Sequence, residues 1–278
     1  MASADTRLGI EFISAMSMSP PDMATLAGGL GASAIGMAPA PITGNPFGYA
    51  AWSLRDNPSL VRETKQALAD HGVRISLGEG FLILPGSDIN DAEKDFDLMA
   101  ELGAECLNVC VFEKDNARAV AQFARFAEMA AARNLPATVE FMPGSTAPDM
   151  AGALDLVMAA MQPNAGVLVD SMHYLCTGGT AAELAMIDPK LILYAQLCDK
   201  ADTQIGPDYF DLARNERPIP GEGTLQLAEF VATLPKHCTI GLEVPSVKKA
   251  LAGQRPEQTL LAAIAAGRTM LADITVTQ

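Results

Sequence analysis

Short apolar runs recur along the whole sequence, and each is followed by a longer segment with helical spacing of its apolar residues. Eight such runs of four to eight residues can be counted, at 8–13, 34–37, 73–77, 106–112, 137–141, 166–170, 191–198 and 239–244. They are apolar at consecutive positions, as a β-strand is when both faces of its sheet are covered. The pattern therefore predicts eight buried, parallel strands.

The segments between these runs carry the start and stop signals of helices. Asn57 and Pro58 open one segment, an apolar stripe follows, and Gly72 ends it. Asp115 opens another segment, whose apolar face continues as far as the stop at Pro136. A leucine and isoleucine stripe over 260–271 indicates the last helix.

Eight strand-then-helix units in about 250 residues are typical of a (β/α)8 TIM barrel. An open, doubly wound sheet is the alternative, but no Gly-x-Gly-x-x-Gly turn follows the first run. No linker or shift in composition divides the chain. We therefore predict an α/β protein with a single TIM barrel domain that spans residues 1–278.

Composition and charge exclude several classes of protein. Hydrophobic residues make up 49% of the chain, which is ample for a large core, and the net charge of −14 opposes a nucleic-acid partner. No apolar stretch reaches the ~18 residues that a membrane span needs. The first residues lack the pattern of a secretory signal, and the five cysteines form no Cys-x-x-Cys pair. These features predict free thiols, no membrane partner and a cytoplasmic location.

Polar residues stand at the ends of several predicted strands. In a TIM barrel the active site collects at the carboxyl ends of the strands. Glu140, Asp170 and Glu243 each end an otherwise apolar run, and Gln196 occupies the equivalent height in the seventh run. Other polar residues at strand ends are Glu11, Glu79, His173 and Asp199.

Three carboxylates at one barrel mouth would repel one another unless a positive charge lies between them. Carboxylate and amide oxygens are hard ligands that suit Mg²⁺ or Mn²⁺. Any one of these carboxylates could instead pair with an arginine or cap a helix. Because four such residues lie on consecutive strands at the same end, we expect a divalent metal site there.

Five motifs follow one another in order along this part of the chain. They are Val-Glu-Phe at 139–141, Val-Asp-Ser-Met-His at 169–173, Gln-Leu-Cys-Asp at 196–199, Arg-Pro-Ile-Pro-Gly-Glu-Gly at 217–223 and Leu-Glu-Val-Pro at 242–245. In this series the chain resembles the xylose-isomerase-like TIM barrels, specifically the sugar phosphate isomerase/epimerase group. That group includes tagatose-type 3-epimerases, hydroxypyruvate isomerases, inosose dehydratases and 3-dehydroshikimate dehydratases. The resemblance covers residues 8–271.

The resemblance implies a role for each strand-end residue. The implied ligands of a divalent ion (Mn, Mg, Co or Zn) are Glu140, Asp170, Gln196 and Glu243. Glu140 and Glu243 correspond to the pair that removes and returns the substrate proton. His173 matches the family's Asp-x-x-His pattern, in which the histidine points at a substrate oxygen near the metal.

Three further groups are candidates for the substrate pocket. Arg217 matches the family's arginine upstream of its Pro-Gly turn and could bind a carboxylate, phosphate or enediolate oxygen, although a loop ion pair is the alternative. Glu79 is a candidate substrate-binding or acid/base group. Trp52 and Phe81, which are expected in the loops after the second and third strands, could line the pocket or serve as packing residues.

The resemblance implies a divalent-metal-dependent isomerase or epimerase. Its substrate would be a small polyhydroxy carbonyl compound, keto-sugar or hydroxypyruvate-like, and the reaction would pass through a metal-stabilised enediolate. The sugar epimerases usually have histidine at the position of Gln196. A glutamine there is similar to the hydroxypyruvate isomerases and dehydroshikimate dehydratases. A dehydratase is therefore the alternative, since the same enolate can expel a β-hydroxyl group.

Other classes in the same superfamily fit less well. A non-catalytic sugar-binding barrel would be expected to lack one of the four ligands, and none is missing. The endonuclease IV branch binds DNA through a histidine-rich zinc site, whereas this chain has three histidines and a charge of −14. A homo-oligomer is compatible with the resemblance, which does not fix the oligomeric state.

Overall fold

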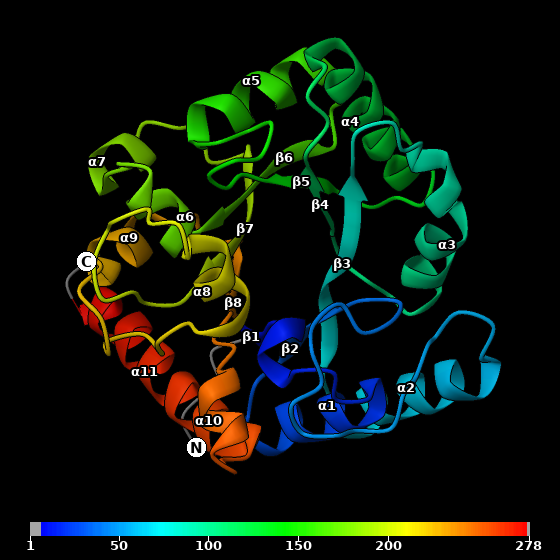
Figure 1. The fold of residues 1–278 in the computed structure, drawn as a ribbon, viewed down its shortest axis with the longest axis vertical. Coiled ribbons are helices and arrows are strands. Elements are labelled where there is room, and N and C mark those ends of the chain that lie inside the picture. Colours follow the sequence, from blue (N-terminus) through cyan, green and yellow to red (C-terminus); the bar gives the residue numbers. More distant parts are fainter. Residues whose placement is uncertain (1–6, 277–278) are drawn as a thin grey trace.

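The computed structural model describes residues 7–276 and contains a closed barrel of eight strands (Figure 1). Each strand pairs in parallel with the next one along the chain, and β8 closes the barrel on β1. The predicted (β/α)8 TIM barrel is therefore confirmed. The strands are β1 (Leu8–Ile10), β2 (Ala34–Met37), β3 (Arg74–Ile83), β4 (Leu107–Val111), β5 (Ala137–Glu140), β6 (Ala165–Asp170), β7 (Ile192–Leu197) and β8 (Thr239–Leu242).

Helices surround the barrel and connect its strands (Figure 1). The first five α-helices are α1 (Pro20–Gly29), α2 (Pro58–His71), α3 (Glu93–Glu101), α4 (Asn116–Ala131) and α5 (Met150–Ala160), with short 3-10 turns η1 (Phe12–Ala15) and η2 (Ile89–Ala92). The predicted start signals act as caps, since Asn57 accepts a hydrogen bond from the Leu60 amide and Asp115 from the Arg118 amide. Gly72 ends α2 in the left-handed conformation that glycine favours.

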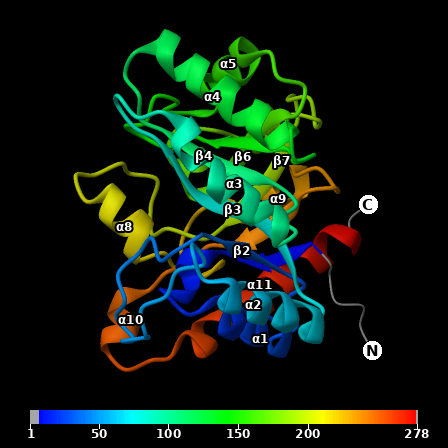
Figure 2. The same ribbon diagram turned by 90° about the vertical axis from the view of Figure 1, so that its right-hand side faces the viewer.

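Two helices follow each of the last three strands. They are α6 (Ser171–Cys176) and α7 (Ala181–Leu184), α8 (Tyr209–Asn215) and α9 (Leu227–Thr233), and α10 (Val247–Leu251) and α11 (Pro256–Val276). Figure 2 shows α8 and α10 projecting from the left side of the molecule. Because α8 and α10 follow β7 and β8, this side carries the carboxyl ends of the strands.

The third strand is longer than the sequence predicts. It continues through Ile83 instead of ending at residue 77. A bulge between Gly78 and Phe81 lets the pairing with β4 continue, because β3 advances by three residues there while β4 advances by two. Glu79 therefore lies inside a strand. The placement of Phe81 in a loop was wrong, since its ring belongs to β3 and packs against Phe96 and Phe126.

Glycines make room for carboxyl groups inside the barrel. A Cβ on Gly241 of β8 would lie 1.5 Å from Glu11 Oε1. A Cβ on Gly36 of β2 would lie 2.5 Å from Glu11 Oε2 and 2.1 Å from Glu79 Oε1. Both positions must lack a side chain for the two glutamates to enter the interior.

The structure also bears on the cysteines and on membrane association. All five cysteines are free thiols, as the sequence predicts. Among residues 7–276, no helix has the length and apolar character needed to span a bilayer.

We expect Gly241→Ala to destabilise the fold by about 3 kcal/mol, because the added methyl group overlaps the buried Glu11 carboxyl group. Urea unfolding measures the change. Gly29→Ala is the control, since nothing lies within 4 Å of a Cβ there, and it should change stability by no more than about 1 kcal/mol. Adding Glu11→Ala to Gly241→Ala should recover part of the loss, and equal costs for the two glycine variants would contradict the packing described here.

Candidate metal centre and active site

The strand ends bring the four expected metal-binding residues to one end of the barrel. Glu140 and Asp170 are the last residues of β5 and β6, and Glu243 follows the last residue of β8. Gln196 of β7 is the register partner of Asp170. All four side chains are buried. The barrel topology, rather than proximity in sequence, makes these residues neighbours.

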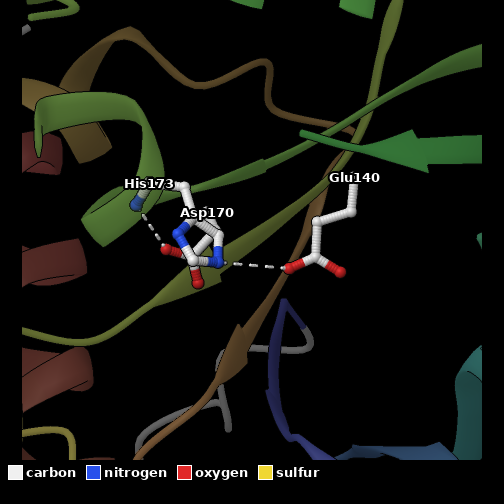
Figure 3. A group of neighbouring side chains, drawn as sticks. All are labelled: Glu140, Asp170 and His173. Atoms are coloured by element: carbon white, nitrogen blue, oxygen red, sulfur yellow. Dashed lines mark hydrogen bonds and ion pairs between the residues drawn. The ribbon is translucent and has the colours of Figure 1, made fainter. Parts of the chain in front are cut away.

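Glu140, Asp170 and His173 form the closest group (Figure 3). One ligand atom from each lies within 4.8 Å of the others, and His173 Nε2 is 3.8 Å from Glu140 Oε1. Asp170 caps α6, because its Oδ1 accepts a 2.9 Å hydrogen bond from the His173 amide. The Asp-x-x-His spacing is therefore the spacing of a helix cap, and it holds both side chains at the strand end.

Arg217 joins this group to Glu243. Its Nη1 lies 2.5 Å from Asp170 Oδ2 and its Nη2 lies 2.7 Å from Glu243 Oε2. Its Nε donates to the Ala213 carbonyl, and only 4% of the side chain is exposed. Of the two interpretations of Arg217, the structure shows the ion pair, and the guanidinium also lines the cavity described below.

Gln196 contributes an amide to the same site. Its Nε2 donates a 3.2 Å hydrogen bond to Glu243 Oε1. Its Oε1 is buried and has no hydrogen-bond partner within residues 7–276. A buried acceptor without a donor is costly, so this oxygen is free to take a ligand.

Three residues that the sequence analysis missed hold Glu140 in place. Asn108 Nδ2 donates to Glu140 Oε2 at 2.9 Å, and the Cys110 thiol approaches the same oxygen at 3.5 Å. Thr138 donates to Asn108 Oδ1, which directs the amide nitrogen at the carboxylate. Asn108 and Thr138 are polar residues within otherwise apolar runs, and that interruption is the signal that could have identified them.

Tyr209 is a further residue that sequence reasoning missed. Its hydroxyl lies 2.7 Å from His173 Nδ1, and both groups are buried. Tyr209 begins α8, far from His173 in the sequence, so no local spacing connects the two.

Burial perturbs the ionisation of these groups. Burial and the neighbouring Asp170 carboxylate raise the pKa of Glu140 to about 7. Burial lowers the pKa of His173 to about 4, so the imidazole is neutral at pH 7 and its approach to Glu140 is not an ion pair. Burial alone would raise the pKa of Asp170, but Arg217 and His173 hold it below its usual value. Burial also raises the pKa of Glu243, although Arg217 opposes this.

Glu79 and Glu11 form a second carboxyl pair in the barrel interior. Glu79 Oε1 accepts a 3.1 Å hydrogen bond from the Phe12 amide, and Tyr194 donates a 2.7 Å hydrogen bond to Glu11 Oε1. Burial and the adjacent Glu11 raise the pKa of Glu79 well above its usual value. Glu79 lines the cavity, whereas Glu11 is fully buried.

A cavity of about 570 Å³ lies beside these side chains. Its polar lining residues are Thr43, Glu79, Asn108, Glu140, His173, Arg214, Arg217 and Glu243. Large apolar side chains supply the rest of the wall, from Ile13, Ile42, Phe81, Leu82, Phe112, Met142 and Phe210. Trp52 is not among the lining residues, because its ring packs edge-on against Phe12 and its Nε1 donates to the Ser17 carbonyl.

A family comparison covers most of the chain. Residues 26–269 match the family model described as xylose isomerase-like TIM barrel. The chain belongs to this family. The residues that match the xylose isomerase-like TIM barrel model include every residue that lines the cavity except Ile13.

The curated relatives are enzymes of two kinds. The chain is 31% identical over 184 residues to a 3-dehydroshikimate dehydratase of Pseudomonas aeruginosa, which is 62% of this chain and 29% of that protein. It is 32% identical over 98 residues to an inosose isomerase of Bacillus licheniformis, which is 34% of each protein. The chain therefore spans only about a third of the length of these relatives, or less.

Solved structures share the fold over almost the entire chain. The IOLI protein, described with a bound zinc atom, is 17% identical with a TM-score of 0.74, covering 96% of this chain and 97% of that one. An L-ribulose 3-epimerase is 13% identical with a TM-score of 0.75, covering 98% and 96%. At these identities the likeness shows the barrel fold.

We expect Arg217→Gln to destabilise the protein by about 3–5 kcal/mol, because it leaves two buried carboxylates without their cation. Arg55→Gln is the control, since it breaks a surface ion pair with Asp95 and should cost no more than about 1 kcal/mol. Denaturant unfolding of both variants provides the comparison. A cost for Arg217→Gln as small as that of the control would show that the buried ion pairs do not support the fold.

Proposed function

We propose that this protein is a divalent-metal-dependent enzyme that removes a proton next to the carbonyl group of a small polyhydroxy carbonyl compound. One observation carries the proposal: three buried carboxylates and a free amide oxygen meet at the end of the barrel beside a cavity. Barrel ends of this kind are where TIM barrel enzymes carry out their chemistry.

The charges of these side chains fit a divalent cation. Glu140, Asp170 and Glu243 carry three negative charges when ionised, and Arg217 supplies one positive charge. The two remaining negative charges equal the charge of one divalent ion. Such an ion would also give the buried Gln196 Oε1 a partner. Carboxylate and amide oxygens are the ligands that Mg²⁺ and Mn²⁺ prefer, and a nearby imidazole also suits Zn²⁺ or Co²⁺.

The proposed ligands are Glu140, Asp170, Gln196 and Glu243, with His173 beside them. The ion would polarise a substrate carbonyl group and thereby acidify the neighbouring C–H bond. Glu140 and Glu243 come from strands on different sides of the barrel mouth, so one can remove the proton and the other can return it on the opposite face. Asn108 keeps Glu140 oriented during this transfer.

Arg217, Glu79 and His173 are the proposed substrate-binding groups. All three line the cavity. His173 is neutral at pH 7 and held by Tyr209, so it can exchange a hydrogen bond with a substrate oxygen. Burial and the adjacent Glu11 raise the pKa of Glu79 well above its usual value, and its carboxyl group faces the cavity, where it can form a hydrogen bond with the substrate.

Isomerisation or epimerisation follows if the proton returns to carbon, and dehydration follows if the enolate expels a β-hydroxyl group. One observation favours the dehydratase as a second candidate. The matches to 3-dehydroshikimate dehydratases from two Pseudomonas species cover 62% of this chain. Gln196 speaks against a tagatose-type epimerase, but the resemblance implies the same amide in hydroxypyruvate isomerases and in dehydroshikimate dehydratases. Both reactions share the same first proton transfer.

Protein purified without added metal should contain close to one equivalent of Mn, Mg, Co or Zn. The variant that combines Glu140→Gln with Glu243→Gln should lose this metal, because two of the charged ligands become neutral. Elemental analysis measures the content, and Glu229→Gln, which changes an exposed glutamate of α9, is the control. A wild-type protein that holds no metal and takes up no added Mn²⁺ would overturn the proposal.

Metal binding should release protons near neutral pH. In the metal-free protein Glu140 has a pKa of about 7, so it is partly protonated near neutral pH and the ion must displace this proton; the pKa of Glu243 is raised as well, which acts in the same direction. The affinity for Mn²⁺ should therefore increase as the pH rises from about 6 to about 8. Calorimetry in buffers of different ionisation enthalpy counts the protons, and Glu140→Gln should release fewer of them. An affinity independent of pH would contradict this charge assignment.

A substrate panel tests the reaction itself. The metal-loaded protein should exchange a substrate C–H proton with solvent deuterium for at least one of 3-dehydroshikimate, an inosose and L-ribulose. Glu140→Gln and Glu243→Gln should each slow the exchange by at least about 100-fold, as expected for loss of a general base or acid. Glu229→Gln should retain full activity. The product, a rearranged ketone or a dehydrated acid, separates the isomerase from the dehydratase.

A further inference from the structure

One face of α8 and of the turn after it lines the cavity. Ala213 and Arg214 follow Phe210 by three and four residues, which puts the three on one side of α8, and Arg217, just after the helix, also contributes to the wall. Arg217 is buried at the carboxylate cluster, whereas Phe210 and Arg214 are exposed. The same short segment therefore contacts both the carboxylate cluster and the open part of the cavity.

Within residues 7–276, Arg214 is a cation without an acidic partner. Its Nη2 makes one long hydrogen bond, 3.4 Å, to the Ile42 carbonyl, and no carboxylate of residues 7–276 forms an ion pair with it. Arg217, the other arginine in the wall, already forms ion pairs with Asp170 and Glu243. Lys200, which lies in the same connection between β7 and β8, is engaged by Asp202 and two carbonyl groups.

The side chains that share the cavity wall with Arg214 are mostly apolar. Ile42, Leu82, Phe112 and Met142 offer no hydrogen bond to a ligand, and the Phe210 ring lies close over Gly144, where an added Cβ would be 3.1 Å from its edge. A hydroxyl group that faces these apolar side chains would have no hydrogen-bond partner among them. A ring compound with an apolar face avoids that cost.

We propose that Arg214 binds a carboxylate of the substrate, and that the substrate is a cyclic hydroxy-keto acid rather than a neutral sugar. The inference rests on the proposed function, since it names the substrate class of the same site. Of the two guanidinium groups in the cavity wall, that of Arg217 already pairs with Asp170 and Glu243, which leaves that of Arg214 for an anionic group of the substrate. A guanidinium binds a carboxylate through two parallel hydrogen bonds. A phosphate dianion would call for more than this single unpaired cation.

Binding of two unreactive probes tests the assignment without any turnover. Cyclohexanecarboxylate and cyclohexanecarboxamide have the same ring and differ in charge, and calorimetry or ligand-observed NMR gives their affinities for the protein as purified. The wild type should bind the carboxylate about tenfold more tightly or better, as a charge-assisted pair implies. Arg214→Ala should lose this preference, and Arg214→Lys should keep part of it.

Arg62→Ala is the matched control, because it removes one equally exposed positive charge from α2, outside the cavity. It should leave the preference unchanged. A preference that persists in Arg214→Ala would place the carboxylate elsewhere, the metal centre included, and would overturn the assignment. Inorganic phosphate that competes with the carboxylate at equal affinity would also overturn it, in favour of a general anion site.

Kinetics separate this inference from the proposed function. In Arg214→Ala, KM for a keto-acid substrate should rise about tenfold or more while kcat stays within about threefold, and KM for a neutral ketone should not change. If the wild type turns over neither compound, the proposed function fails, while the two probes still decide what Arg214 binds. Equal effects on the keto acid and the neutral ketone would refute the carboxylate contact.

Discussion

The ion pairs of Arg217 with Asp170 and Glu243 are the interaction on which the rest of the site depends. They place one buried guanidinium between the ends of β6 and β8, and they fix the end of α8 against the barrel. Without this cation, burial of three carboxylates so close together would strongly disfavour their ionised forms. With it, Asp170 stays ionised, and the site retains the negative charge that a divalent ion would neutralise.

The connection between β7 and β8 links several parts of the site. Tyr209 contacts His173, Arg217 joins Asp170 and Glu243, and Phe210 and Arg214 line the open part of the cavity. The segment that supports the carboxylate cluster therefore also lines the cavity in which the substrate is proposed to bind. A change in substrate preference by exchange of this loop would have to preserve Tyr209 and Arg217.

The sequence allowed the barrel and the strand-end residues to be predicted, because buried parallel strands are continuous apolar runs and their last polar residues stand out. It could not show the β3 bulge, since Gly78 to Gly80 interrupt the run without indicating that pairing continues. Asn108 and Tyr209 were missed because their contacts cross from one strand or loop to another. The spacing of residues along the sequence does not reveal such contacts, because only the closed barrel brings these residues together.

The glycines that face Glu11 have a consequence for how this barrel can diverge. A side chain at position 241 would overlap Glu11, and one at position 36 would overlap both Glu11 and Glu79, so these glutamates must be lost, shortened or moved first. The order of these substitutions is therefore constrained by volume. Homologues with a larger residue at position 241 should carry a small residue where this chain has Glu11, and those with a larger residue at position 36 should also have changed Glu79.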